Sequence, residues 1–485
     1  MSQRRVNETS LIATADAIRA KAGTTDPITW VDGEGFKAAV EAIPAGGSST
    51  PSAGRNDVTF IDYDGTVLYS YTTAEAQALT ELPPLPEHAG LICQGWNYDL
   101  ATIKEYNRPV TVGAMYITDD GKTRIYITLH EGRTSPMLGV CPNGTVTVDW
   151  GDGTTPNTLT GTSVSTVKWT PTHNYAAPGD YVITLTVDGT MGISGSPSSN
   201  QYSYLLRYAS GTDTRNRVYQ NAIKKIEVGN GVTSIGNSAF YYCYSLASIT
   251  IPDSVTSIGN SAFYNCYSLV SITIPNRITS IGNSSFYYCH SLASISIPNR
   301  ITSIGDSTFS YCYSLASITI PDGVTSIRNS AFNRCYSLAN ITIPDSITSI
   351  ENMAFYSCYS LANITIPDGV TSIGNSSFDS CHSLASISIP NRITSIGDST
   401  FSYCYSLASI TIPDGVTSIR NSAFNSCNGA NFYDFTTHTV VPTLSNTNAF
   451  SGIPADCEIR VPAALYDSWI AATNWSTYAS QIVAV

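Results

Sequence analysis

Cysteine and histidine are the residues of this chain best able to bind a metal or to attack a substrate. Nine of the twelve cysteines recur once every 23 residues, at Cys243, Cys266, Cys289, Cys312, Cys335, Cys358, Cys381, Cys404 and Cys427. Equivalent residues of stacked repeats carry parallel side chains, which suits packing better than a disulfide. The C-x₂-C or C…H-x₃₋₅-H grouping of a zinc site is missing. The spacing therefore predicts a ladder of buried, reduced thiols, with no metal site and no cofactor.

The other polar residues form no catalytic motif. The sequence contains no H-E-x-x-H, no G-x-S-x-G and no phosphate-binding glycine loop. His290 and His382 occupy one repeat position, which holds tyrosine in most other repeats. Asp149 and Asp152 could ligate Ca²⁺, but tight Asp-Gly turns explain them better because alternating oxygen ligands are missing. We therefore expect no catalytic residue; a glycosidase carboxylate pair within residues 55–135 is the enzymatic alternative.

Composition and charge exclude several classes of protein. Charged residues make up 12% of the chain, and a net charge of −12 without a Lys/Arg run argues against nucleic-acid binding. The chain has no run of 18 apolar residues, so we expect no membrane insertion. Residues 1–21 do not have the continuous apolar core of a signal peptide. The weakly charged, hydroxyl-rich composition nevertheless suits a protein that works outside the cell.

A 23-residue repeat dominates the second half of the chain. The first copy, TSIGNSAFYYCYSLASITIPDSV, spans residues 233–255, seven more follow to Val416, and a ninth ends after Cys427. A fixed period of this length indicates a solenoid, in which stacked units bury one continuous core.

Each part of the repeat has a predicted role. Phe240, Cys243 and Leu246 fall three apart on one face of a short helical turn. Ile249 and Ile251 alternate with hydroxyl residues, so the isoleucines should point inward along a strand. An Asn or Asp before the turn is expected to cap its free N–H groups, at Asn237, Asn260, Asn283, Asp306, Asn329, Asn352, Asn375, Asp398 and Asn421. Stacked strands should form a parallel sheet with coils about 4.8 Å apart.

Imperfect repeats are expected to close both ends of the solenoid. IEVGNGV (residues 226–232) aligns with the ITIPDSV of a full repeat but is not preceded by the turn. Phe450 and Ile459 keep the repeat spacing near the other end, and ALYDSWIAATNWSTY with Trp469 and Trp475 then predicts a helix that covers the last open edge.

The motif F-x-x-C-x-S-L-x-x-I-x-I-P is similar to the BspA-like leucine-rich repeat of bacterial surface antigens, which also occurs in phage tail proteins. This resemblance covers about residues 223–485. It implies an adhesive protein that binds host proteins, other cells or glycans.

The N-terminal residues predict a helical segment. Two short amphipathic helices are expected within residues 1–43, as a docking or oligomerisation element. The Gly-, Ser- and Pro-rich residues 44–54 predict a flexible linker. ADAIRAKAGTTDPITWVDGEGFKAAVEAI (residues 15–43) resembles N-terminal pieces of tail-associated proteins from phages and prophages of Gram-positive bacteria.

Between the linker and the repeats the sequence predicts β-rich modules. VTFIDYDGTVLYSYT indicates a hairpin around Asp64-Gly65, and with LICQGW it resembles the internalin-type B repeat, a β-grasp-like module. A second hairpin is predicted to turn at residues 120–121. Residues 109–190 have the turn spacing of a β-sandwich of short strands. There, TVTVDWGDGTTPNTL and HNYAAPGDYVITLTV are similar to the PKD domain, an immunoglobulin-like spacer or binding module.

Together these patterns predict a multidomain protein: short N-terminal helices, β-rich modules including a PKD-like sandwich, and a leucine-rich-repeat solenoid with terminal caps. The expected parts are the helical segment 1–43, the linker 44–54, the β-rich module 55–108, the sandwich 109–190, a connector 191–222, the solenoid 223–427 and the capping repeat and helix 428–485.

Residues that flank the repeat cysteine are the candidate binding surface. They are Tyr241, Tyr242, Tyr244, Tyr264, Tyr267, Tyr287, Tyr288, His290, Tyr311, Tyr313, Arg334, Tyr336, Tyr356, Tyr359, His382, Tyr403 and Tyr405. Tyrosine offers a large, rigid contact area, as in antibody paratopes. Residues 279–324 recur at 371–416 with changes only at Tyr287 and Tyr288, which lie among these residues. The alternative is that the tyrosines only pack along the outer turn.

The leading functional hypothesis is a non-enzymatic, phage tail-associated adhesin located on the virion. Its N-terminus would bind other tail proteins, and its solenoid would bind a glycan or protein of the bacterial surface. The alternative is a bacterial cell-surface adhesin with the same fold, and a third hypothesis is a tail protein that degrades polysaccharide. A homo-oligomer, such as the trimer of a tail fibre, is compatible with the sequence, although no heptad repeat is present.

Overall fold

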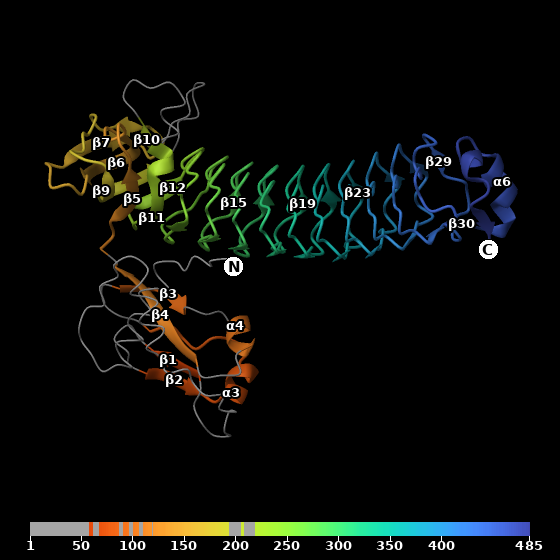
Figure 1. Ribbon diagram of the computed structural model, residues 1–485, viewed down its shortest axis with the longest axis horizontal. Coiled ribbons are helices and arrows are strands. Elements are labelled where there is room, and N and C mark those ends of the chain that lie inside the picture. The colour runs from red at the N-terminus through yellow and green to blue at the C-terminus, as the bar shows by residue number, and fades with distance from the viewer. Residues whose placement is uncertain are drawn as a thin grey trace. The chain divides into compact units, whose positions relative to one another are not determined.

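The computed structural model describes residues 58–61, 67–86, 91–96, 100–105, 110–118, 120–193, 205–207 and 219–485. The chain divides into two compact units, residues 1–120 and 121–485 (Figure 1). The helical segment and linker predicted for residues 1–54 lie outside the described residues. No helix within the described ranges is long and apolar enough to cross a membrane.

The first unit holds a four-stranded mixed sheet in the order β2-β1-β4-β3. Its elements are β1 (Val58–Ile61), β2 (Val67–Tyr71), α3 (Thr73–Ala78), β3 (Leu91–Trp96), α4 (Leu100–Glu105) and β4 (Val110–Thr118). β1 and β2 pair antiparallel, as the hairpin prediction requires, and β1 and β4 are parallel. The rings of Phe60 and Trp96 meet edge to face at 4.9 Å in the core of this unit.

The second predicted hairpin, at residues 120–121, is wrong. β4 pairs with β1 through residues 110–113 and with β3 through residues 114–118, and it does not pair with the next strand. β5 (Thr123–Leu129) pairs instead with β9 (Gly179–Ile193) and β11 (Ile223–Glu227) of the second unit. The boundary between the units therefore falls after residue 120 rather than after residue 108.

Two long strands organise the start of the second unit, where shorter strands were expected. β6 (Met137–Asp149) and β9 pair antiparallel, and β7 (Asn157–Thr162), β8 (Lys168–Trp169) and β10 (Leu206–Arg207) also pair with β6. Gly144 lies opposite Gly189, with φ of 122° and 106°. A Cβ at Gly144 would lie 2.2 Å from the Asp188 carbonyl oxygen, so only glycine allows the two backbones to approach this closely.

This β-rich region and the solenoid share one sheet. β11 pairs antiparallel with β5 on one side and parallel with β13 (Ser248–Thr250) on the other. Ile226 pairs with Ile249, which confirms the predicted alignment of the first, incomplete repeat. The parts predicted as sandwich, connector and solenoid thus form one compact unit, in which β5 covers the edge of the first coil.

The solenoid consists of two rows of short strands, one on each side of every coil (Figure 1). After β13, the first row contains β14 (Ser271–Thr273), β16 (Ser294–Ser296), β18 (Ser317–Thr319), β20 (Asn340–Thr342), β22 (Asn363–Ile364), β24 (Ser386–Ile387), β26 (Ser409–Thr411), β28 (Phe432–Asp434) and β30 (Glu458–Val461). The second row contains β12 (Val232–Ile235), β15 (Ser280–Ile281), β17 (Ser303–Ile304), β19 (Ser326–Ile327), β21 (Ser349–Ile350), β23 (Ser372–Ile373), β25 (Ser395–Ile396), β27 (Ser418–Ile419) and β29 (Thr443–Leu444). Pairing is parallel and joins equivalent residues, for example Ile272 with Ile295.

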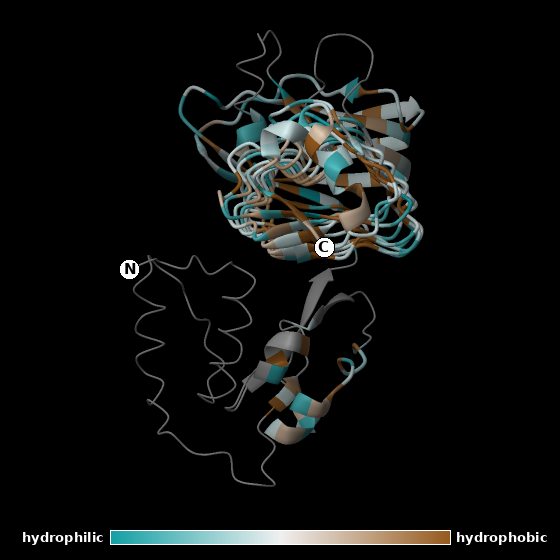
Figure 2. Ribbon diagram, turned by 90° about the vertical axis from the view of Figure 1, so that its right-hand side faces the viewer, coloured by the Kyte–Doolittle hydropathy of each residue, from teal (hydrophilic) through white to brown (hydrophobic). Residues whose placement is uncertain are grey.

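Repeated side chains stack inside the coils. Phe rings from Phe240 to Phe450 form a continuous column with 5.1–5.6 Å between neighbouring centroids. Each repeat thiol from Cys266 to Cys427 donates to the carbonyl of the phenylalanine in the preceding coil at 3.1–3.3 Å. The cysteines outside β3 are buried and free, so the predicted thiol ladder is confirmed for the repeats. Viewed along the solenoid, hydrophobic and hydrophilic segments alternate around the superimposed coils (Figure 2).

The predicted helical turn and its cap are wrong. The segment between the Asn and the repeat cysteine is a series of turns without helix. The Asn237 side chain accepts a hydrogen bond from the backbone N–H of Asn260, the equivalent residue of the next coil, at 2.8 Å. The same bond recurs along most of the array but is replaced at Asn329, whose N–H donates to Glu351. These side chains therefore connect coils rather than cap a helix.

The C-terminal cap differs in detail from the predicted helix. It contains the 3₁₀ turn η1 (Ala463–Leu465), α6 (Tyr466–Ala471), the 3₁₀ turn η2 (Trp475–Tyr478) and β31 (Ile482–Ala484). Trp469 and Trp475 are fully buried, as expected, and their rings lie 4.6 Å apart. The last strand of the sheet is β31, which pairs parallel with β30. The edge of the last coil is therefore paired with a strand, whereas a helix was expected to cover it.

The buried thiols should be unreactive in the folded protein. Burial raises the pKa of the Cys335 thiol well above its usual value and that of Cys427 to about 12, so thiolate is scarce at pH 8. We expect a water-soluble disulfide reagent to label the repeat cysteines only after denaturation, as read by mass spectrometry of the labelled peptides. Fast labelling of several repeat cysteines in the native protein would contradict the buried ladder.

Acid should loosen the C-terminal cap through His438. This ring is 3% exposed and lies 5.2 Å from the ring of Phe435. Burial lowers the pKa of His438, and the Asp414 and Asp434 carboxylates oppose this only in part. The unfolded chain therefore takes up a proton first as pH falls below about 6.5, which costs stability. We expect the midpoint of urea unfolding to fall between pH 7.5 and pH 5.5, and to fall by more in the wild type than in His438→Phe. An equal fall in both proteins would show that groups other than His438 cause the loss of stability.

Candidate binding surface

The backbone of the outer turn places alternate side chains outside the core. Phe240 and Tyr242 donate N–H groups to the carbonyls of Ala262 and Tyr264 in the next coil, at 2.7 and 2.9 Å. Tyr242 has a φ of 63°, and its equivalents in the following repeats also have positive φ. Phe and Cys point inward, and three further positions flank them: one and two residues after the Phe, where exposure ranges from buried to exposed, and one after the Cys, where the side chains are partly or fully exposed. We call these three positions the turn face.

The position after the cysteine builds a continuous column of aromatic rings, here called the ring column. Its members are Tyr244, Tyr267, His290, Tyr313, Tyr336, Tyr359, His382 and Tyr405, and neighbouring ring centroids lie 4.4–4.7 Å apart. Between His290 and His382 the ring planes lie within 14° of parallel. Both histidines lie between two tyrosine rings, and burial lowers the pKa of each, so they stay mostly neutral at pH 7.

The other two positions of the turn face are aromatic mainly in the early repeats. Tyr241, Tyr264 and Tyr287 stack at 4.7 and 4.8 Å, and this row then changes to Ser310 and Asn333. In the row beside it, Tyr288, Tyr311 and Arg334 are consecutive, with 4.2 Å between the two tyrosine rings. The predicted surface is therefore densest around these repeats. Later repeats contribute isolated members of the set, Tyr356 and Tyr403.

Stacking determines what the turn face offers a ligand. Because ring faces cover one another along the column, ring edges and hydroxyl groups meet the solvent, and a sugar ring has no free face to stack on except at the column ends. Exposure varies among the predicted residues: Tyr241 is 8% exposed, whereas Tyr359, Tyr403 and Tyr405 are 38–41% exposed. The tyrosines thus pack along the turn, and all of them except Tyr241 are also partly or fully exposed; their role in binding stays a prediction.

The strand face is the other long, repetitive surface. Thr273 and Thr319 are exposed there. On the opposite row several threonine hydroxyls are already used, such as Thr256 Oγ1, which donates to the Thr233 carbonyl at 3.2 Å. In the full repeats, the strand face presents mainly short hydroxyl and amide side chains.

The PKD-like motif residues come together in the β-rich region. Trp150 and His173 stack at 4.4 Å, the Tyr175 hydroxyl donates to the Trp150 carbonyl at 2.9 Å, and His173 Nε2 lies 2.7 Å from Asp152 Oδ2. Burial opposes ionisation of Asp152, but hydrogen bonds from Thr154 and His173 outweigh it, so the pKa of Asp152 is below its usual value. Asp152 also accepts the Thr154 N–H within its turn, as the Asp-Gly turn interpretation requires. This arrangement stabilises a loop.

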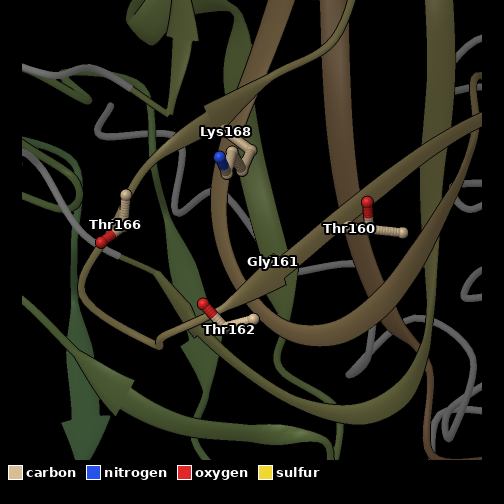
Figure 3. A pocket seen from close by; sticks show the side chains of 5 residues that line it. All are labelled: Thr160, Gly161, Thr162, Thr166 and Lys168. Carbon is tan, nitrogen blue, oxygen red and sulfur yellow. The ribbon is translucent and has the colours of Figure 1, made fainter.

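A concavity beside β7 is a further feature of the β-rich region. It has a volume of about 340 Å³ and is lined by Thr160, Gly161, Thr162, Thr166 and Lys168, which include a single charged group (Figure 3). Within the described ranges, no three His, Cys, Asp or Glu side chains are grouped so that they could hold a metal ion.

Comparison with known proteins identifies the repeat. The family described as the BspA type leucine-rich repeat region matches residues 215–339 and 302–431. Residues 215–431, which contain the full repeats, form a BspA-type leucine-rich repeat region. This confirms the resemblance drawn from the repeat motif, while the phage-tail and PKD resemblances stay predictions.

Solved structures similar to this chain include other leucine-rich-repeat proteins. A leucine-rich cell surface protein of Faecalibacterium prausnitzii is 29% identical, with a TM-score of 0.36, over 50% of this chain and 83% of that one. A leucine-rich repeat protein of Bacteroides ovatus is 26% identical, with a TM-score of 0.40, over 53% of this chain and 77% of that one. No curated protein matches the chain.

The ring column should contribute to the stability of the BspA-type solenoid. Tyr336 stacks on Tyr313 at 4.7 Å and on Tyr359 at 4.6 Å. We expect Tyr336→Ala to destabilise the protein by about 1–3 kcal/mol, because both stacks and the buried ring area are lost. Tyr336→His is the matched control, since histidine already occupies this position at 290 and 382. Urea unfolding followed by circular dichroism measures the difference; equal losses in both variants would show that stacking contributes nothing specific.

Proposed function

We propose that this protein is a non-enzymatic adhesin that contacts a cell surface through the turn face of its solenoid. The observation that carries the proposal is that residue identity varies among the repeats on the turn face but not at the Phe and Cys of the core. Phe and Cys are invariant across the repeats, yet the residues beside them change among tyrosine, arginine, serine, asparagine and aspartate. Residues that the core does not require, and that include many large aromatic side chains, are typical of a recognition surface.

The repetitive surface favours many weak contacts over one deep site. Ring edges and hydroxyl groups recur along the array at the coil spacing. A glycan or protein of the bacterial surface that itself repeats could engage several coils at once, so the apparent affinity would exceed that of each contact. We propose such a polymer as the partner.

The finer proposal is that the adhesin belongs to a phage or prophage tail. The resemblance of residues 15–43 to tail-associated proteins supports this, and their role would be to dock to other tail proteins. The alternative is a bacterial cell-surface adhesin. Density-gradient fractionation of a culture lysate with mass spectrometry distinguishes them: the tail proposal requires co-sedimentation with capsid and tail proteins, and recovery only with cell envelopes would exclude it.

A face-specific comparison tests the adhesin proposal. The turn-face variant Tyr242→Ser/Tyr264→Asn/Tyr356→Asn uses residues that other repeats carry at these positions. The strand-face variant Thr273→Lys/Thr319→Lys alters exposed positions. We expect fluorescently labelled protein to bind intact cells of the source bacterium, and the turn-face variant to bind at least tenfold more weakly while the strand-face variant binds normally. The reverse result would move the site to the strands, and no binding by the wild type to any cell tested would contradict the adhesin role.

A further inference from the structure

The duplicated block contains a natural comparison that locates one site. Extended to the next cysteine, residues 279–335 match residues 371–427 at all but three positions. The differing pairs are Tyr287 and Asp379, Tyr288 and Ser380, and Arg334 and Ser426. Because the two blocks share every core residue, these differences concern the turn face alone.

The three differing residues meet around a single ring. Tyr311, which is also tyrosine in the second block, lies 5.3 Å from Tyr287 and 4.2 Å from Tyr288 between ring centroids. The Arg334 guanidinium lies 5.0 Å above the Tyr311 ring, and its Nη1 donates to the Tyr311 hydroxyl at 3.0 Å. Differences separated by up to 47 residues in the sequence (334 − 287) are thus adjacent in space.

The backbone at this site gives an independent signal. Tyr288, Tyr311 and Arg334 have φ of 61°, 62° and 59°, in the left-handed region. Bulky side chains are unfavourable there, and asparagine is better tolerated. Asn265 occupies the same repeat position with a φ of 62°. Tyr242 and Tyr403 share this position and conformation, so what distinguishes the site is the run of three bulky residues in consecutive coils.

Arg334 is prepared to bind an anion. Its guanidinium is oriented by Tyr311, and no carboxylate of the described residues forms an ion pair with it. A guanidinium keeps its charge, and its fork of N–H donors matches carboxylate or phosphate oxygens. On the turn face, all of which is described within the repeats, Arg334 is the one arginine or lysine and Asp379 the one acidic residue. The two blocks therefore differ in charge as well as in shape.

The tyrosines that pack against Tyr311 supply hydroxyl groups. Burial and neighbouring phenols raise the pKa values of Tyr287 and Tyr288, so both hydroxyls remain protonated at neutral pH. A protonated phenol can donate and accept hydrogen bonds. Hydroxyl groups beside a guanidinium suit a sugar that carries an acidic group, because one part of the site binds the anion and the other binds the sugar hydroxyls.

We propose that Tyr287, Tyr288, Tyr311 and Arg334 form a binding site for an acidic saccharide that carries a carboxylate or a phosphate. The equivalent residues of the second block, with Asp379 and Ser426, do not form this site. The proposal deepens the adhesin function, on which its biological role rests, by naming the chemical class of the ligand and the coils that bind it.

Calorimetric titration of the full chain tests the site. The probes are an oligogalacturonate for carboxylate, a glycerol phosphate oligomer for phosphate, and a neutral galactose oligomer as control. We expect at least one acidic probe to bind, and Arg334→Ser to weaken it about tenfold or more, since a charge-assisted hydrogen-bond pair is lost. Arg334→Lys should be intermediate because it keeps the charge without the fork. Binding should also weaken with rising salt.

The second block provides a gain-of-function test. Asp379→Tyr/Ser380→Tyr/Ser426→Arg installs the first block's residues on an identical core, and should raise the number of bound acidic oligomers from one to two per chain. The loss variant Tyr287→Asp/Tyr288→Ser should bind weakly yet stay folded, as its circular dichroism spectrum would show, because the second block already folds with these residues; the lost ring contacts should lower its melting temperature. A stoichiometry of one in the gain variant would overturn the assignment of these residues as the site.

Further outcomes separate this site from the adhesin function. If the wild type binds no acidic probe, binds the neutral oligomer equally well, or binds as Arg334→Ser does, the site is wrong. If Arg334→Ser still adheres to cells as the wild type does, the adhesin function stands without this site. If no cell binds the wild type while the acidic probe does, the site stands and the adhesin function fails.

Discussion

The hydrogen-bonded and stacked contact between equivalent residues of successive coils is the interaction on which the rest of the structure depends. Phe263 donates its N–H to Ser285 at 2.8 Å, and its ring stacks on Phe286 at 5.2 Å. Both contacts hold the coil spacing near that of a parallel sheet. An aromatic residue placed on the outer turn of consecutive coils is then forced to stack as well. The geometry of the ring column thus follows from the coil spacing that the core sets.

Much of the fold could be predicted from the sequence because each repeat position obeys a local rule. The inward direction of Ile249 follows from strand alternation, and the burial of Cys243 follows from its spacing to Phe240. The misses share a different cause. Asn237 bonds a residue of the next coil, and β5 pairs with β11 from far along the chain. A sequence pattern predicts local structure but does not identify which residues distant in the sequence pair with one another. The local interpretations of these two segments as a helix cap and a hairpin were therefore wrong.

The candidate site likewise has features that the sequence could predict and features that it could not. Its residues could be chosen from the sequence because they vary while the core repeats. The sequence could not predict whether the rings present their faces or their edges to the solvent, because that depends on how the rings of neighbouring coils stack. The role of Arg334 depends on contact with Tyr311, 23 residues earlier, which becomes evident only when the coils are placed in register.

The low charge of the chain, 12% of residues, has a consequence for how such a surface can bind. With few ionic groups, affinity must come from hydrogen bonds and apolar contact, which are individually weak. Weak contacts are effective only when little conformational entropy is lost on binding. Rings held on both sides by stacking, as Tyr336 is between Tyr313 and Tyr359, have already lost their rotational freedom on folding. In the proposed adhesin this order would lower the entropic cost of recognition, and a single oriented cation such as Arg334 would have a large effect on which polymer is preferred.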